Sequence, residues 1–382
     1  YDAARATARA SASDLFPEID ASGQAGRQRV SANRPLSSGS AATYDNYVVG
    51  ASLDYEIDLW GRVRNSVTAA RADAAASAGD LASARLSLQA AVADAYARLR
   101  GLDTEADLLR RSVEAFTRAY DLTATRHDGG IASGVDVNRA RTVLANARAQ
   151  ISAVANERAA TEHEIAALVG AVASDFAIAP RIQQPGTLAV PASAPSTLLQ
   201  RRPDIAAAER RMFGANARIG VARAAWFPSL SLGLAGGWQT TGPSLLSTPS
   251  SFWGLGPLSA VATLFDGGRR AAEVKLSRAQ YDEASAGYRD TVLAAFRQVE
   301  DALAATRHLA TQAIEQRDAA TAAQRTSDLA LTRYHDGAAD YLEVVTAQTE
   351  ALDSERALIA VETGRMRASI ALVKALGGAP AA

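Results

Sequence analysis

The chain has 382 residues, a formal net charge of −1 and 21% charged residues. This balance excludes the broad basic surface that a nucleic-acid-binding protein needs. Cysteine is absent, which excludes disulfides and thiolate chemistry, and no run of about 18 apolar residues is available for a transmembrane helix.

The chain begins with an Ala- and Arg-rich stretch that predicts a short helix over residues 1–14, ending before Phe16-Pro17 because proline cannot continue a helix. Apolar and polar residues then alternate over 19–25 and 49–59, which predicts two strands with one apolar and one polar face. The Ser-, Ala- and Gly-rich segment 30–46 between them is predicted to be an exposed loop. The polar face carries Asp20, Gln24, Ser52, Asp54, Glu56 and Asp58.

Residues 62–128 contain no proline and place apolar side chains at alternating steps of three and four, which is the seam of a coiled coil. We therefore predict one helix of about 65 residues, about 100 Å long at about 1.5 Å per residue. A Gly-rich turn and a returning helix over 135–169 follow. Helices of this length need partners along their whole length, because packing stabilises them in water more than propensity does.

The second half of the chain repeats the first at a constant offset. Gly61-Arg62 corresponds to Gly268-Arg269, Gly130 to Gly337, and Gly170 to Gly377. The turn glycines stay in register over more than a hundred residues, which indicates a true internal repeat. The predicted segments are 1–14 (partial helix of the first repeat), 15–60 (first β-hairpin), 61–170 (first helical hairpin), 171–202 (Pro-rich linker), 203–226 (short helix), 227–266 (second β-hairpin, with its loop at 240–251 and its last strand over 253–265), 267–377 (second helical hairpin) and 378–382 (a shortened counterpart of the linker).

Aromatic residues gather at the two ends of the predicted strands, Phe16, Trp60, Trp226, Phe227 and Phe265 at one level and Tyr44, Tyr47, Trp238, Phe252 and Trp253 at the other. Two aromatic levels on strands of about ten residues are typical of a transmembrane β-barrel. A small soluble sheet with aromatic end caps is the alternative. Because the smallest membrane barrels have about eight strands, several chains would have to share one barrel.

Residues 198–232 read LLQRRPDIAAAERRMFGANARIGVARAAWFPSLSL, which resembles the signature of the outer-membrane factors of bacterial multidrug efflux, the TolC/OprM-like (NodT-type) family. LFDGGR at 264–269, RYHDG at 333–337 and DYLEVVTAQ at 340–348 match as well. With DLWGR at 58–62 and the LVG that ends at Gly170, the resemblance covers nearly the whole chain.

The resemblance implies a mixed α and β fold in which long coiled-coil helices form a periplasmic α-barrel, or tunnel. Each chain of a homotrimer would give four strands to a shared transmembrane β-barrel in the outer membrane of a Gram-negative bacterium. The implied function is a passive conduit for drugs or other small molecules. Its partners would be outer-membrane lipid, a periplasmic adaptor protein and an inner-membrane efflux transporter of the RND or a similar class. Many members begin with a lipidated cysteine, and because this sequence starts later it leaves lipidation open.

Acidic residues lie one turn into the returning helices, Asp136 in the first repeat and Glu343 with nearby Asp340 in the second. One explanation is that they complement the positive ends of helices. The other is that copies of them line the periplasmic aperture and favour cations, as acidic rings do in cation pathways. The family often has a second acidic residue one turn after Glu343, where this chain has Thr346.

Arginines flank both turns, Arg126 and Arg333 before them and Arg139 just after the first. They either remain solvated at the helix ends or form a latch to Asp136 or Glu343 that holds the aperture shut, since Arg makes directional carboxylate pairs. Arg201-Arg202-Pro203-Asp204 is interpreted as a helix start with a structural role.

The sequence contains no pattern typical of an enzyme. The four histidines are dispersed, His163-Glu164 lacks the second histidine of a zinc helix, and neither a nucleophile elbow nor a phosphate-binding loop is present. We therefore expect no catalytic, cofactor or metal site. The alternative function is a soluble periplasmic coiled-coil adaptor, which would have one helical hairpin flanked by compact β-domains.

Overall fold

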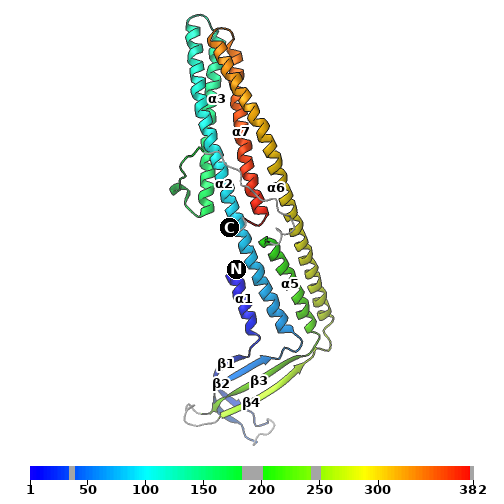
Figure 1. The fold of residues 1–382 in the computed structure, drawn as a ribbon. Helices are drawn as coiled ribbons and strands as arrows, with labels where there is room; N and C mark the ends of the chain where they lie inside the picture. Colours follow the sequence, from blue (N-terminus) through cyan, green and yellow to red (C-terminus); the bar gives the residue numbers. More distant parts are fainter. Residues whose placement is uncertain (34–38, 183–200, 242–250, 379–382) are drawn as a thin grey trace. The chain divides into compact units, whose positions relative to one another are not determined.

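The computed structural model describes residues 1–33, 39–182, 201–241 and 251–378 (Figure 1). In chain order its elements are α1 (Asp2–Ser13), β1 (Glu18–Val30), β2 (Ala42–Glu56), α2 (Arg62–Asp128), α3 (Gly134–Val169), the 3₁₀ turn η1 (Ala173–Asp175), α5 (Pro203–Ala224), β3 (Ser229–Thr240), β4 (Ser251–Val261), α6 (Arg269–His335) and α7 (Tyr341–Ala375). Most of the predicted Pro-rich linker, the centre of the 240–251 loop and the end of the 378–382 tail lie outside the described residues.

The chain divides into two compact units, one made of residues 1–81 and 204–291 and the other of residues 82–203 and 292–382. Helices α2 and α6, of 67 residues each, contribute to both units. Among the described helices, none combines the length and the apolar character that crossing a membrane requires.

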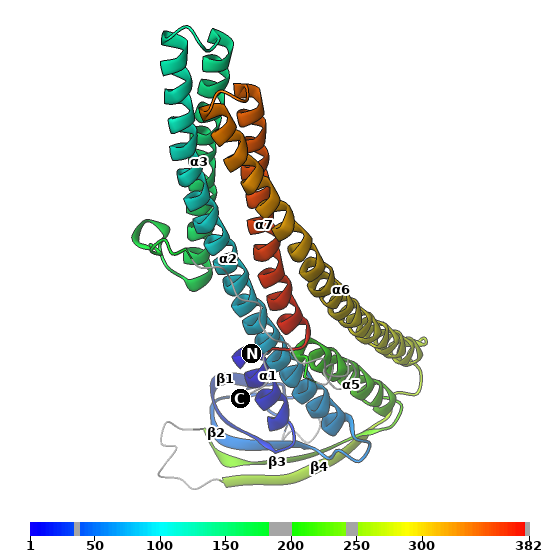
Figure 2. The same cartoon turned by 45° about the horizontal axis from the view of Figure 1, so that its top comes forward.

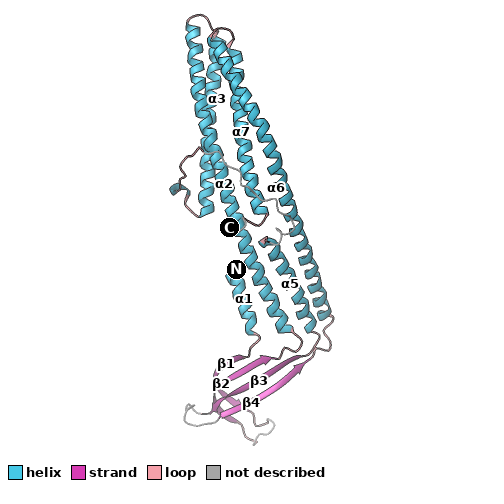
Figure 3. Cartoon of the chain, viewed as in Figure 1, coloured by secondary structure: helices cyan, strands magenta, loops and turns pink. Residues whose placement is uncertain are grey.

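In the first unit the four strands form one antiparallel sheet in the order β1-β2-β3-β4 (Figure 3). The fourth strand ends at Val261, earlier than the predicted 265, because its partner β3 begins at Ser229, directly after Pro228, and Val261 is the residue opposite Ser229. Pro257 lies in this edge strand, where a missing backbone donor is tolerated. The short helix also ends earlier than predicted, at Ala224, and two turn-type hydrogen bonds carry the chain through Trp226 and Phe227.

Helix α5 lies along the first part of α2, as both views show (Figure 2). Small side chains bring the two helices together, since a β-carbon added at Gly214 would lie 3.4 Å from the Ala72 β-carbon. Ion pairs of Arg218 with Asp73 and of Arg211 with Asp80 link the same two helices. This unit is therefore a sheet whose strands lead into closely packed, Ala-rich helices.

In the second unit the predicted coiled-coil seam of α2 is confirmed. Leu99 and Leu109 are fully buried, and the seam packs against Leu144, Ala147 and Val154 of α3. A second cluster joins α2, α3, α6 and α7 through Ala119, Ala140, Tyr334, Tyr341 and Val344. The core of this unit thus consists of separate clusters rich in Ala and Leu, one of which contains a pair of buried tyrosines.

One close approach between helices depends on a glycine. A β-carbon at Gly101 of α2 would lie 2.4 Å from Thr363 Oγ1 and 3.0 Å from Thr363 Cγ2 of α7. By contrast, a β-carbon at Gly287 of α6 would meet no atom within 4 Å.

We expect Gly101→Ala to lower the free energy of unfolding by about 1–3 kcal/mol, because overpacking forces the two helices apart. Gly287→Ala serves as the matched control and should be neutral or stabilising by up to about 1 kcal/mol, since alanine is the better helix former. Thermal unfolding in detergent followed by circular dichroism measures both. Equal effects of the two substitutions would contradict the close contact at Gly101.

Burial of Tyr341 makes the free energy of unfolding depend on pH in the alkaline range. Its side chain is 2% exposed, and burial, reinforced by Tyr334 and Asp136, raises the pKa of its hydroxyl to about 12. A tyrosine pKa raised by two units from its usual value near 10 corresponds to about 3 kcal/mol in favour of the neutral form.

This contribution to stability should be fully present below about pH 10 and should be lost as the pH rises through about 12, because the unfolded chain releases the proton first. We expect Tyr341→Phe to flatten the fall in the free energy of unfolding across this window, as measured by denaturant titrations at a series of pH values. An unchanged slope in the Phe variant would show that Tyr341 does not contribute.

Candidate functional site

The tip of the first helical hairpin is built by Ser133 and Asp136. Ser133 is the N-cap of α3, and its Oγ accepts a hydrogen bond from the Asp136 backbone N–H at 3.2 Å. The Asp136 carboxylate accepts in return from the Ser133 hydroxyl at 2.7 Å and from its backbone N–H at 3.3 Å. Arg139 lies 3.7 Å from the carboxylate. Asp136 is therefore one half of a capping box, which fits the helix-end explanation of this residue.

The tip of the second hairpin uses a different arrangement. Asp340 is the N-cap of α7 and accepts a hydrogen bond from the Glu343 backbone N–H at 3.0 Å. The Glu343 carboxylate is left for Arg333, whose Nη1 donates to Oε1 at 2.5 Å. Both side chains of this ion pair are partly exposed. The structure thus brings Arg333 and Glu343 together across the turn from α6 to α7, and the aperture role remains a prediction.

Arg126 contacts the other hairpin and neither of the predicted acidic partners. Its guanidinium lies 4.5 Å from the centre of the Tyr334 ring and donates to the His335 carbonyl oxygen at 2.9 Å. The Tyr334 hydroxyl in turn donates to Thr123 Oγ1 at 3.2 Å, and its ring meets Tyr341 edge-on at 5.6 Å. This stack connects the C-terminal end of α2 to the C-terminal end of α6 and to the N-terminal end of α7.

Arg126 stands out in the sequence as a charged residue beside a turn, whereas the two tyrosines of this stack do not. Tyr334 lies within RYHDG and Tyr341 within DYLEVVTAQ, so the two motifs contained a signal. Tyr334 directly follows Arg333 and Tyr341 directly follows Asp340, and aromatic side chains bury a large apolar area when they pack.

The strand register places the polar residues of β1 and β2 on one face of the sheet. Asp20 pairs with Ser52, Gln24 with Val48, and Glu18 with Asp54. Across the next interface Asp54 faces Gly233 and Glu56 faces Ser231. Because paired residues point to the same side of a sheet, the five predicted residues of the strands share one face. Asp58 lies beyond the last residue of β2, and its carboxylate accepts from the Arg64 backbone N–H at 2.9 Å.

The opposite face of the sheet is apolar and uncovered in the single chain. Leu53 pairs with Leu234, Leu234 with Leu255, and Leu232 with Leu258. Leu255 and Leu258 are 72% and 67% exposed. An exposed apolar face of this extent, opposite a polar face, marks a surface that lipid or protein covers.

Aromatic side chains meet where the strands join the helices. The rings of Trp60 and Phe227 stack with their centres 4.6 Å apart, and Trp60 Nε1 donates to the Pro228 carbonyl oxygen at 2.8 Å. Arg270 lies over the Trp226 ring at 5.0 Å. At the other end, the register brings Trp253 opposite Gly236 and Trp238 opposite Val49. The sheet therefore carries aromatic side chains at both ends.

The described part of the chain contains no group of three or more His, Asp or Glu residues that could hold a metal ion. The acidic side chains at the tips are occupied with helix caps and an arginine. The candidate site therefore consists of charged side chains at the helix ends and on the polar face of the strands.

Comparison with known proteins gives a consistent result. The model of the family described as outer membrane efflux protein matches residues 1–171 and 194–378. The chain is 34% identical over 379 residues to the probable efflux pump outer membrane protein TtgC of Pseudomonas putida, covering 99% of this chain and 78% of the relative. It is also 34% identical over 383 residues to the outer membrane protein OprJ of Pseudomonas aeruginosa, covering 99% and 79% of the two chains.

Among solved structures, the outer membrane protein VceC of Vibrio cholerae superposes with a TM-score of 0.92 at 26% identity, covering 99% of this chain and 90% of that one. The fold agrees with the mixed α and β architecture of long helices and a four-stranded sheet, and it does not support a soluble adaptor. The chain belongs to the outer membrane efflux protein family and is the outer-membrane channel component of an efflux system.

Proposed function

We propose that three copies of the chain form one passive conduit, with their sheets joined into a shared transmembrane barrel and their helices forming a tunnel in the periplasm. The conduit would receive drugs or other small molecules from a periplasmic adaptor and an inner-membrane transporter of the RND or a similar class. It performs no catalysis and needs no cofactor. The observation that carries the proposal is the sheet, which has one polar face, one exposed apolar face and, among the described residues, no strand beside either of its two edges.

The unpaired edges argue for a barrel shared between chains. Among the described strands, β1 and β4 each have one neighbour, so each leaves a row of backbone groups without a partner. In hydrocarbon every such group must be hydrogen-bonded, which only a closed barrel achieves for strands. Four strands cannot close, since the smallest membrane barrels have about eight. Pairing the β4 edge of one copy with the β1 edge of the next closes the sheet.

In such a barrel, one face of the sheet would contact lipid and the other would contact water. Leu255 and Leu258, together with Trp238 and Trp253, share the apolar face and would face outer-membrane lipid. Asp20, Asp54 and Glu56 would face the water-filled interior. Relatives named as antibiotic and toluene efflux pump proteins of Pseudomonas putida support small molecules as the cargo.

At the hairpin tips, the Arg333–Glu343 pair supports a closed resting aperture. Asp136, Asp340 and Glu343 give each chain three carboxylates near the tips, with Arg139 and Arg333 beside them. Breaking the pair between Arg333 and Glu343 would release the start of α7 from the end of α6. The acidic residues that remain would favour cations in the opened aperture.

The test of the assembly is the mass of the detergent-extracted protein, followed by single-channel conductance of the same sample in a planar bilayer. We expect a trimer that conducts and prefers cations. A monomer that is soluble without detergent and does not conduct would contradict the proposal and favour an interaction protein instead.

The latch is tested by charge reversal at the second tip. Arg333→Glu should raise the open probability several-fold, because two carboxylates then face each other where the ion pair stood. The swapped pair Arg333→Glu with Glu343→Arg should restore the closed state. Arg325→Glu, at an exposed position of the same helix, is the matched control and should leave gating unchanged.

Selectivity is measured separately from gating. Asp136→Asn and Glu343→Gln should each shift the reversal potential toward lower cation preference, since each removes one carboxylate per chain. If the potential does not move in either variant, Asp136 serves only as a helix cap, Glu343 serves only as the partner of Arg333, and the aperture role is wrong.

A further inference from the structure

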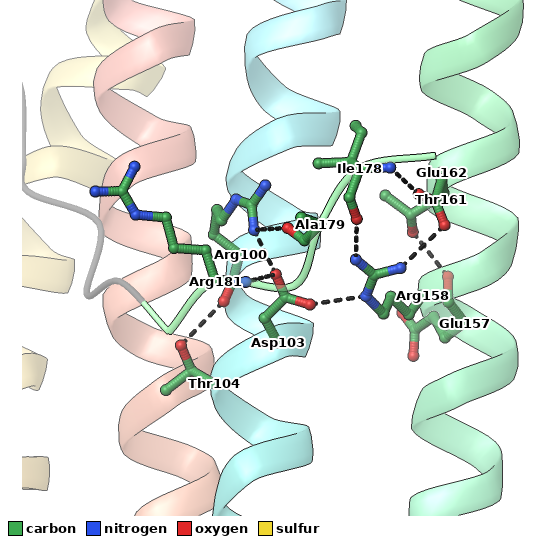
Figure 4. A network of polar contacts seen from close by, with 10 residues as sticks. All are labelled: Arg100, Asp103, Thr104, Glu157, Arg158, Thr161, Glu162, Ile178, Ala179 and Arg181. Carbon is green, nitrogen blue, oxygen red and sulfur yellow. Dashed lines mark hydrogen bonds and ion pairs between the residues drawn. The ribbon is translucent and has the colours of Figure 1, made fainter. Parts of the chain in front are cut away.

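Four charged side chains form a cluster between α2 and α3 in the second unit (Figure 4). Arg100 and Asp103 come from α2, and Arg158 and Glu162 come from α3. Asp103 joins the helices, because its Oδ2 accepts from Arg100 Nη1 at 2.6 Å and its Oδ1 accepts from Arg158 Nε at 2.7 Å. Arg158 Nη1 also donates to Glu162 Oε2 at 2.9 Å. We call these four residues the Asp103 quartet; its two cations balance its two anions.

The quartet holds a short extended segment, residues 176–181, which we call the strap. Arg158 Nη2 donates to the Ile178 carbonyl oxygen at 2.7 Å and Arg100 Nη1 to the Ala179 carbonyl oxygen at 3.1 Å. The Arg181 backbone N–H donates to Asp103 Oδ2 at 3.0 Å, and the Ile178 N–H donates to the Glu162 carboxylate. Every member of the quartet thus binds the strap backbone, and Figure 4 shows the strap running between the two helices.

The apolar side chains of the strap complete the contact. Phe176 and Ile178 pack against the cluster formed by Ala95, Leu99 and Ile165. The strap is therefore fixed to α2 and α3 by both backbone hydrogen bonds and apolar packing.

Burial makes this arrangement costly unless all its members are present. The Asp103 side chain is 1% exposed and that of Arg100 is 6% exposed. Although burial alone would lower the pKa of the Arg158 guanidinium, its contacts with Asp103 and Glu162 raise it. Buried ion pairs are weak sources of net stability, because desolvation opposes their attraction, and their best-attested use is to specify one register.

The internal repeat shows that a helical hairpin of this type packs without such a quartet. At the equivalent positions the second repeat keeps two arginines, Arg307 and Arg365, but has Ala310 and Ser369 in place of the two acids. Arg365 pairs instead with Glu362 of its own helix at 2.8 Å. Helices α6 and α7 still approach each other there, since a β-carbon at Gly364 would lie 3.8 Å from Leu309. The quartet therefore serves a need that is specific to the first hairpin.

That need is the register of α3 against α2. Their interface consists mainly of Ala and Leu side chains, and a slide by one turn, about 5.4 Å, would again place apolar groups against apolar groups. A buried cluster of charges allows a single register, because any slide leaves its members desolvated and unpaired.

We propose that Asp103 is a positioning residue of the channel, which fixes the strap between α2 and α3 and thereby sets the axial register of α3 and the place of Asp136 at the hairpin tip. The register claim stands on the quartet alone, whereas its effect on the aperture rests on the proposed function.

The register can be measured directly because the chain contains no cysteine. Spin labels on cysteines introduced at Glu114 of α2 and Ala145 of α3, both exposed, report the distance between the helices when labelled chains are diluted with unlabelled ones. We expect one narrow distance in the parent protein and a broadened or two-peaked distribution in Asp103→Ala. Arg158→Gln should do the same and serves as the milder variant if Asp103→Ala fails to fold.

Arg365→Gln is the matched control, because it removes the equivalent arginine of the second repeat, where neither of the two acids is present. It should leave the distance unchanged. Amide exchange at Arg181 should accelerate at least tenfold in Asp103→Ala, which removes its acceptor, and should not change in Arg365→Gln.

An apolar replacement of the whole quartet separates register from stability. In Arg100→Met, Asp103→Leu, Arg158→Met and Glu162→Leu combined, we expect the melting temperature to return close to that of the parent while the distance distribution stays broad. A narrow distance in this variant, or in Asp103→Ala, would overturn the inference. Such a result would not bear on the proposed trimeric channel. That proposal is tested only by the mass and conductance of the parent protein.

Discussion

The structure depends on one constraint, which is that a single chain exposes more apolar surface than it can cover. Leu255 and Leu258 of the sheet are exposed to solvent. Leu276, Leu293 and Leu329 of α6 are exposed as well. Removing such side chains from water is worth about 1.5–3 kcal/mol each. In the proposed trimer, lipid covers the apolar side chains of the strands, and neighbouring copies cover those of the helices.

The internal repeat helps to cover this apolar surface. Each half provides two strands and a helical hairpin, so a ring of repeats presents equivalent faces to its neighbours on both sides. The halves nevertheless differ where their surroundings differ. Arg126 and Arg333 occupy equivalent positions, but Arg126 stacks on Tyr334 of the other hairpin, whereas Arg333 pairs with Glu343 across its own turn. Repetition fixes the scaffold, and local neighbours decide the contacts.

This division also explains what could be predicted from sequence. The bounds of α2 followed from a proline-free stretch with a seam of period 3.5 and a Gly-rich turn, and the strand faces followed from a period of two. Such patterns reflect backbone geometry, which is local. The end of β4 at Val261 was missed because it depends on where its partner β3 begins. The Arg126–Tyr334 stack was missed because its two residues are far apart in the sequence and meet only when the hairpins pack.

Several acidic residues of the chain are committed to contacts within it. Buried or capped acidic groups such as Asp103, Asp136 and Asp340 hydrogen-bond to backbone or to arginine within the same chain. A carboxylate that is committed to a cap or to a strap has few free lone pairs for a passing solute. The carboxylates of the polar strand face would line the water-filled interior of the proposed barrel, where charge is screened over about 8 Å at physiological salt. The charged residues that cap helices or hold the strap therefore act mainly on how the helices are held.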